Sequence, residues 1–201
     1  MPAAAQHLAG KLLLVLAAAL LTGCSTYRLQ GPARVSDPVQ VHVLDYGRHA
    51  SLALPAPDGA WEEWFWGDWN WFAKGRRGVL EGAEALFASR GSALGRRRLP
   101  VSVERLGGAA GALQSLCVEV ERARAEALQR QLWARFELAR TTLVRHPDGR
   151  EFVFDTARYS LSNTSAHQLA RWLRQLGVDV RGGRSPTADF RLETRCSSPR
   201  V

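Results

Sequence analysis

The sequence lacks the signatures of several large enzyme classes. It contains no glycine-rich loop followed by a phosphate-binding lysine and no glycine fingerprint of a dinucleotide site. Its five histidines are scattered without the spacing of metal ligands, so we predict no cofactor and no bound metal. Beyond the N-terminal region it has no apolar run of membrane-spanning length and no internal repeat. These absences argue against nucleotide-dependent enzymes, metalloenzymes, multi-span membrane proteins and repeat architectures.

An apolar run near the N-terminus predicts export. Lys11 precedes the run, residues 12–21 are Leu, Val and Ala, and no acidic residue lies upstream, which is the pattern of a secretory signal peptide. The run is much shorter than the roughly 20 residues that a helix needs to cross a bilayer. It ends in Leu21-Thr22-Gly23-Cys24, which resembles the lipobox of bacterial lipoproteins. We therefore predict cleavage before Cys24 and attachment of lipid to its thiol.

The residue after the lipidation site bears on the destination of the protein. Ser25 stands where many Gram-negative lipoproteins carry an aspartate that resembles an inner-membrane retention signal. The resemblance implies an exported, membrane-anchored lipoprotein of the outer membrane, with its domain on the periplasmic face. The predicted organisation is a signal peptide (1–23), a lipidated tether rich in Gly, Pro and Ser (24–38), one domain (39–181), and a C-terminal tail (182–201) with an edge strand over 187–194.

Alternating and helical patterns predict an α+β domain, with a small antiparallel sheet packed against helices. The predicted strands are 39–43, 51–54, 61–66, 99–106 and 151–155. The predicted helices are 79–90, 118–140 and a segment that begins at residues 163–165 and ends at Gly177. The three arginines at 96–98 are predicted to lie in a loop.

The charge and the remaining cysteines leave two questions open. The formal net charge is +8 and nearly all of the basic residues are arginine, which favours an anionic envelope polymer, a lipid or an envelope protein as partner. Nucleic acid is not expected outside the cytoplasm, and an arginine-rich composition is equally typical of a GC-rich genome.

Cys117 and Cys196 have two possible states. They form a disulfide, which the periplasm permits, or Cys117 stays a buried thiol, which is the simpler expectation for a cysteine in an apolar stretch.

Three short motifs carry the candidate chemistry. They are Gly47-Arg48-His49 at the start of a predicted strand, Trp66-Gly67-Asp68 after the next one, and Ser162-Asn163-Thr164-Ser165 at the start of the last helix. In this order they resemble a bacterial lipoprotein family of unknown function, similar to the circularly permuted papain-like superfamily that includes NlpC-type and lecithin:retinol acyltransferase-like enzymes. The resemblance implies a permuted papain-like fold in which His49 is the base, Asp68 orients it, and Ser165 takes the place of the nucleophile.

The nucleophile position departs from the family pattern. The family has a cysteine where this chain has Ser165, and a helix N-terminus with a nearby imidazole ionises a thiol far more readily than a hydroxyl. The favoured hypothesis is therefore a catalytically degenerate envelope lipoprotein that acts as a binding or structural module. The alternative is an amide or ester hydrolase or acyltransferase of the cell envelope that uses Ser165 and His49.

Five of the seven tryptophans lie between Trp61 and Trp71. A cluster of this kind is most often core, and its rings are alternatively expected to line a groove for sugar, lipid or peptide. The candidate groove residues are Trp64, Trp66, Trp69 and Trp71.

Overall fold

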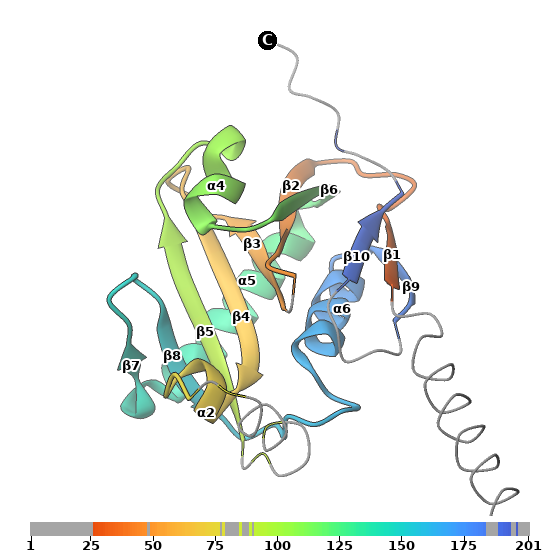
Figure 1. Ribbon diagram of the computed structural model, residues 1–201. Helices are drawn as coiled ribbons and strands as arrows, with labels where there is room; N and C mark the ends of the chain where they lie inside the picture. Colours follow the sequence, from red (N-terminus) through yellow and green to blue (C-terminus); the bar gives the residue numbers. More distant parts are fainter. Residues whose placement is uncertain are drawn as a thin grey trace, which may run out of the picture.

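The computed structural model describes residues 26–47, 49–76, 78, 85, 89, 91–183, 189–193 and 196. It has the predicted α+β class, with two sheets and the helices packed against them (Figure 1). The larger sheet has the strand order β6-β2-β3-β4-β5-β8-β7, and the smaller one has the order β10-β1-β9. None of the described helices is long and apolar enough to cross a membrane.

All neighbouring strands of the larger sheet run antiparallel. Its strands are β2 (Pro38–Asp45), β3 (Ala50–Pro55), β4 (Trp61–Asp68), β5 (Ser92–Leu99), β6 (Gln114–Glu121), β7 (Val144–Arg145) and β8 (Glu151–Asp155). In the smaller sheet β1 (Thr26–Gln30) runs antiparallel to β9 (Asp179–Gly182) and parallel to β10 (Asp189–Leu192). The helices are α2 (Trp69–Phe72), α4 (Leu106–Ala110), α5 (Arg122–Leu138) and α6 (Ser165–Gln175), with 3-10 turns η1 (Val103–Arg105) and η2 (Arg140–Thr142).

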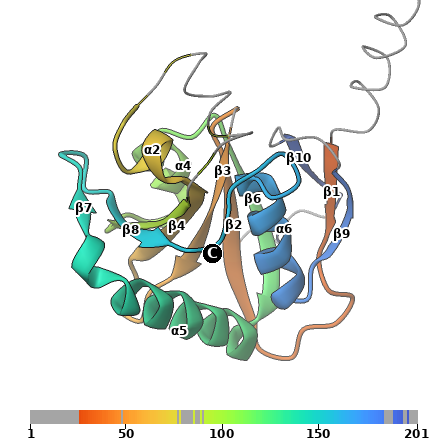
Figure 2. The ribbon, with the colours of Figure 1, turned by 90° about the horizontal axis from the view of Figure 1, so that it is seen from below.

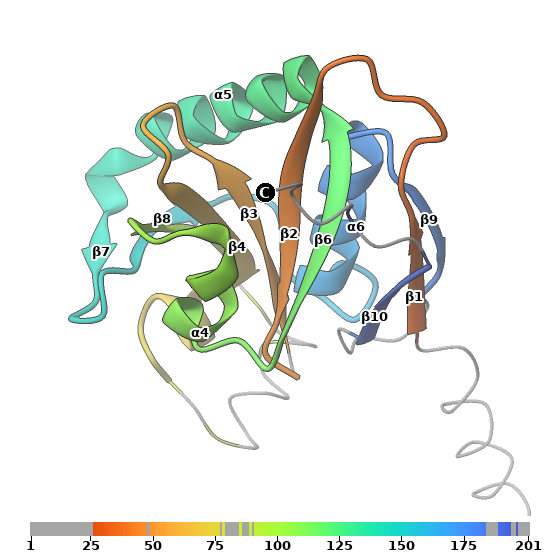
Figure 3. The same ribbon diagram turned by 90° about the horizontal axis from the view of Figure 1, so that it is seen from above.

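The two faces of the larger sheet carry different helices. Helices α5 and α6 lie on one face, and α2 and α4 lie on the other (Figures 2 and 3). Successive residues of a strand point to opposite faces, so Trp64 and Trp66 of β4 pack in the cluster that includes α5 and α6, whereas Phe65 packs with Phe72 on the α2 side. We call these the α6 side and the α2 side of the sheet.

The sequence located several of these elements. The predicted strands over 39–43, 51–54, 61–66 and 151–155 lie within β2, β3, β4 and β8. The last helix begins at Ser165, and Gly177 beyond its end has φ +87°, in the left-handed region that glycine adopts without strain. Only residues 85 and 89 of the predicted helix over 79–90 are among the described residues. The predicted signal peptide and Cys24 lie outside them.

Three predictions near the centre of the chain were wrong. The arginines at 96–98 belong to β5 rather than to a loop, and the predicted strand over 99–106 is instead the end of β5, the η1 turn and the start of α4. Residues 118–121, predicted to be helical, are the end of β6. An arginine-rich segment forms a strand here because acidic side chains of β4 neutralise it.

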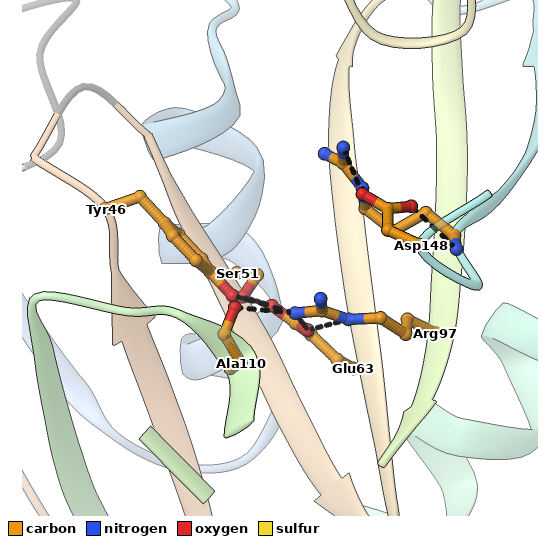
Figure 4. A network of polar contacts seen from close by, with 7 residues as sticks. Tyr46, Ser51, Glu63, Arg97, Ala110 and Asp148 are labelled. Carbon is orange, nitrogen blue, oxygen red and sulfur yellow. Dashed lines mark hydrogen bonds and ion pairs between the residues drawn. The ribbon is translucent and has the colours of Figure 1, made fainter. Parts of the chain in front are cut away.

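The acidic partners are Glu62 and Glu63, which lie on opposite sides of the sheet. On the α2 side, the Arg97 guanidinium donates to Glu63 at 2.6 and 3.0 Å, while Tyr46 and Ser51 donate to the other Glu63 oxygen (Figure 4). Burial, followed by the neighbouring Glu63 carboxylate, raises the pKa of Tyr46. The network satisfies a carboxylate that has no exposed surface, as a buried charge requires.

The α6 side has a second ion pair. The Arg96 guanidinium donates to Glu62 at 2.7 Å, contacts Glu151 at 2.6 Å and lies over the Trp133 ring at 4.2 Å. Because Glu62 and Arg96 belong to neighbouring strands, the pair reinforces the register of β4 against β5.

Segments from both ends of the domain pair in the smaller sheet. Residues 26–30, expected to lie in a tether, form β1 and pair with β9 and β10. The predicted edge strand over 187–194 exists as β10, but it joins the smaller sheet. Cys117 and Cys196 form a disulfide, so the simpler expectation of a buried thiol at Cys117 was wrong. The bond joins β6 to the segment that follows β10.

Candidate functional site

Ser165 lies at the first turn of α6, as the motif predicts. Thr164 is the N-cap residue, and the ring Nδ1 of His167 accepts the Thr164 backbone N–H at 3.3 Å and lies 2.8 Å from its hydroxyl. Only 5% of the Ser165 surface is exposed. A nucleophile must be reached by its substrate, so this burial weighs against attack by Ser165.

A titratable partner of Ser165 is Tyr159, which the sequence did not single out. The Ser165 hydroxyl and backbone hydrogen-bond the Tyr159 phenol, whose ring packs on Trp66 at 5.6 Å between centroids. Burial, followed by the negative charge of Asp68, raises the pKa of Tyr159, although the bonds from Ser165 act in the opposite direction. The phenol therefore keeps its proton at neutral pH and cannot act as the base for Ser165.

Asp68 caps a helix. Its Oδ1 accepts the backbone N–H of Trp71 at 2.9 Å, and its Oδ2 accepts the Ser89 hydroxyl at 2.6 Å. Asp68 is the N-cap of α2, a position at which a carboxylate satisfies free backbone donors. The negative charge of Asp68 nevertheless acts on Tyr159, which contacts Ser165.

His49 contacts the other side. Its ring stacks on Tyr46 with centroids 4.5 Å apart, and it meets the edge of Phe72 at 5.4 Å. Phe72 packs over Gly67 with Phe65 on the α2 side. The ring contacts of His49 are thus to side chains of the α2 side, whereas Ser165 contacts Tyr159, which packs on the α6 side.

Two of the four candidate groove tryptophans are core residues. Trp64 and Trp66 are 0% and 2% exposed, so the expectation that they line an open groove was wrong. Trp64 packs edge-on against Trp133 and Phe136, and the Trp66 indole N–H donates to Asp155 at 2.8 Å. Alternation along β4 turns both rings toward α5 and α6.

A third candidate, Trp69, lies at a real cavity. This cavity has a volume of about 440 Å³ and is lined by Asp68, Trp69, Asn70, Lys74, Arg76, Gly91 and Phe154. We call it the α2 pocket. Trp69 meets Phe154 edge-to-face at 5.4 Å, and Trp71, the fourth candidate, is half-buried beside the pocket in α2.

The α2 pocket combines aromatic surface with positive charge. Lys74 and Arg76 are both exposed, and the Asp68 carboxylate is already occupied by two donors. Such a lining suits an anionic ligand that has a flat apolar face. The two cations were missed because nothing in the sequence indicates that the chain after α2 folds back toward Phe154.

The described residues contain no group of three or more His, Cys, Asp or Glu side chains that could hold a metal ion. No family model, no curated protein and no solved structure matches this chain. The resemblance to papain-like lipoproteins therefore rests on its three motifs.

Proposed function

We propose that this chain is an exported lipoprotein, anchored through Cys24 at the periplasmic face of the outer membrane, whose domain binds an envelope ligand without catalysing a reaction. One observation carries the non-catalytic part. The ring of His49 contacts Tyr46 and Phe72 on the α2 side, whereas Ser165 contacts Tyr159 on the α6 side. A general base must reach the proton that it removes directly or through one water, and the two ring contacts of His49 are to side chains on the opposite side of the sheet from Tyr159.

The ligand of the α2 pocket is proposed to be an acidic glycan. Lys74 and Arg76 supply charge and Trp69 supplies an aromatic face. The full sequence has a formal net charge of +8, of which the predicted signal peptide carries only Lys11, so the domain attracts anionic polymers. We expect the protein, produced without its signal peptide, to retain polygalacturonate but not neutral dextran, with affinity that falls as salt is added. A Lys74→Glu, Arg76→Glu double variant should lose this binding, and equal binding of both polymers would contradict the ligand class.

The non-catalytic part is tested with an electrophilic serine probe. A fluorophosphonate should leave the folded protein unlabelled, and the Ser165→Ala variant serves as the matched control. Labelling that disappears in both Ser165→Ala and His49→Ala would overturn the proposal and favour the envelope hydrolase or acyltransferase instead. Labelling that needs Ser165 but not His49 would refute the inference that Ser165 is inaccessible.

A further inference from the structure

A second and larger cavity lies on the α6 side, between α5 and the turn that joins β3 to β4. Its volume is about 770 Å³, within the range of roughly 300–1,000 Å³ typical of small-molecule sites. It is lined by Val39, Pro55, Ala56, Pro57, Arg122, Ala125, Glu126, Gln129, Arg130 and Trp133. We call it the α5 groove.

The helix side of the groove has two parallel rows of side chains. Ala125, Gln129 and Trp133 follow one another at four-residue spacing, which places them along one line of α5. Arg122, Glu126 and Arg130 form a second row at the same spacing. Ala125 is buried, whereas Glu126 and Arg130 have more than half of their side-chain surface exposed. The groove therefore has a mainly apolar inner wall and a charged outer rim.

The opposite wall offers little to a hydrogen-bonding ligand. Pro55 and Pro57 have no backbone N–H. The Ala56 N–H donates to the Ala60 carbonyl at 2.8 Å, and the Ala56 carbonyl accepts from the Gly59 N–H at 3.1 Å. The turn thus satisfies its own polar groups, so it cannot pair with an added peptide strand, which binds through main-chain hydrogen bonds.

The aromatic end of the groove is held in place. The Trp133 ring has the Arg96 guanidinium over it at 4.2 Å and meets Trp64 edge-on at 5.7 Å. Arg96 is itself fixed by Glu62 and Glu151. A ring whose position is fixed before binding loses little conformational entropy when a ligand covers it.

One cation on the rim is weakly paired. Arg122 donates to Asp37 at 2.9 Å. The Arg130 guanidinium lies farther from its partner, 3.7 Å from the Glu126 carboxylate, and the Arg130 and Glu126 side chains are both largely exposed. Exposed pairs of this kind contribute little energy. Arg130 is therefore available to an anion bound near Trp133, which lies three residues further along the same helix.

We propose that the α5 groove binds a fatty acid such as dodecanoate, with its alkyl chain along Ala125, Gln129 and Trp133 and its carboxylate at Arg130. The apolar walls complement the chain, and the charge of Arg130 complements the head group. This site goes beyond the proposed glycan binding. Its lining has no residue in common with the α2 pocket and does not include Ser165. Its failure is therefore distinguishable from the failure of the proposed function.

The test is calorimetric titration of the protein with dodecanoate below its aggregation concentration, compared with dodecyltrimethylammonium, which has the same chain and the opposite charge. We expect dodecanoate to bind more tightly. Gln129→Trp fills the groove and should weaken dodecanoate about tenfold, the equivalent of excluding about two methylenes. Gln131→Trp, the same change at an exposed position of α5 outside the groove, should leave the affinity unchanged.

The head group is tested by charge reversal. Arg130→Glu should weaken dodecanoate about threefold, as expected for an exposed charge pair, and strengthen the ammonium ligand. Arg124→Glu makes the same change of charge on α5 outside the groove and should have a smaller effect. Absence of dodecanoate binding, equal binding by the Gln129→Trp and unsubstituted proteins, or equal effects of the two arginine variants would overturn the proposal.

Discussion

His42 should make the stability of the domain depend on pH in a way that can be calculated. The residue lies in β2, 5% exposed, with Nδ1 2.9 Å from the Ser115 hydroxyl and its ring 4.9 Å from Trp61. Burial lowers the pKa of His42 from 6.5 to about 4. The imidazole therefore stays neutral in the folded state at pH values where the unfolded chain protonates it.

The sign and size follow from this difference. A lowered pKa in the folded state contributes stability that is fully present above pH 6.5 and is lost as the pH falls toward 4. Each unit of difference is worth about 1.4 kcal/mol. Between pH 7 and pH 4, His42 alone should therefore reduce the free energy of unfolding by about 3 kcal/mol.

The assay is urea unfolding, followed by tryptophan fluorescence, of the protein and its His42→Gln variant from pH 7 to pH 4. Glutamine does not titrate, and every other ionisable group is shared, so the difference between the two free energies isolates His42. We expect that difference to change by about 3 kcal/mol over this range, in favour of the variant at low pH. Two curves that stay parallel would show that the buried site does not exclude the protonated ring.

Three further predictions concern other features. Replacing Cys117 and Cys196 together with serine should lower the free energy of unfolding by about 2–4 kcal/mol, because the disulfide closes a long loop; an unchanged melting temperature would contradict this. Arg97→Met should cost about 3 kcal/mol, because it leaves Glu63 charged and buried, and a second change, Glu63→Gln, should recover part of the loss in urea unfolding. Ser165→Cys should react with dithionitrobenzoate at least about tenfold more slowly when folded than in urea, because thiol reactivity follows exposure; fast reaction in the folded state would indicate an accessible site.

Local patterns predicted the parts of the fold that local physics determines. Val39, Val41 and Val43 alternate with polar residues, and this alternation places β2 correctly. A capping residue, an apolar stripe and Gly177 bound α6 for the same reason. Each signal lies within one turn or one strand of the residue that it describes.

The errors arose where a residue depends on a distant partner. Arg96 and Arg97 resemble loop residues until Glu62 and Glu63, which lie 34 positions earlier, are placed on the neighbouring strand. Cys117 and Cys196 are 79 positions apart, so their spacing cannot distinguish a disulfide from free thiols.

The candidate site shows the same limitation. The motifs located Ser165 at a helix start and Asp68 at a strand end, but they could not give the direction of the His49 ring. That direction depends on the sheet register and on Phe72, which packs over Gly67. The positions of site residues were thus predictable, whereas the side of the sheet that each one faces was not.

The parallel pairing of β1 with β10 also sets the order in which the molecule can be completed. Thr26 and Asp189 are 163 positions apart and are joined by a side-chain hydrogen bond. At synthesis speeds of about 5–20 residues per second, β1 waits on the order of ten seconds after it emerges before β10 exists. Contacts of such long range form slowly. The smaller sheet is thus a late step in folding, which can be completed only after β10 has been made, whereas every strand of the larger sheet precedes β10 in the sequence.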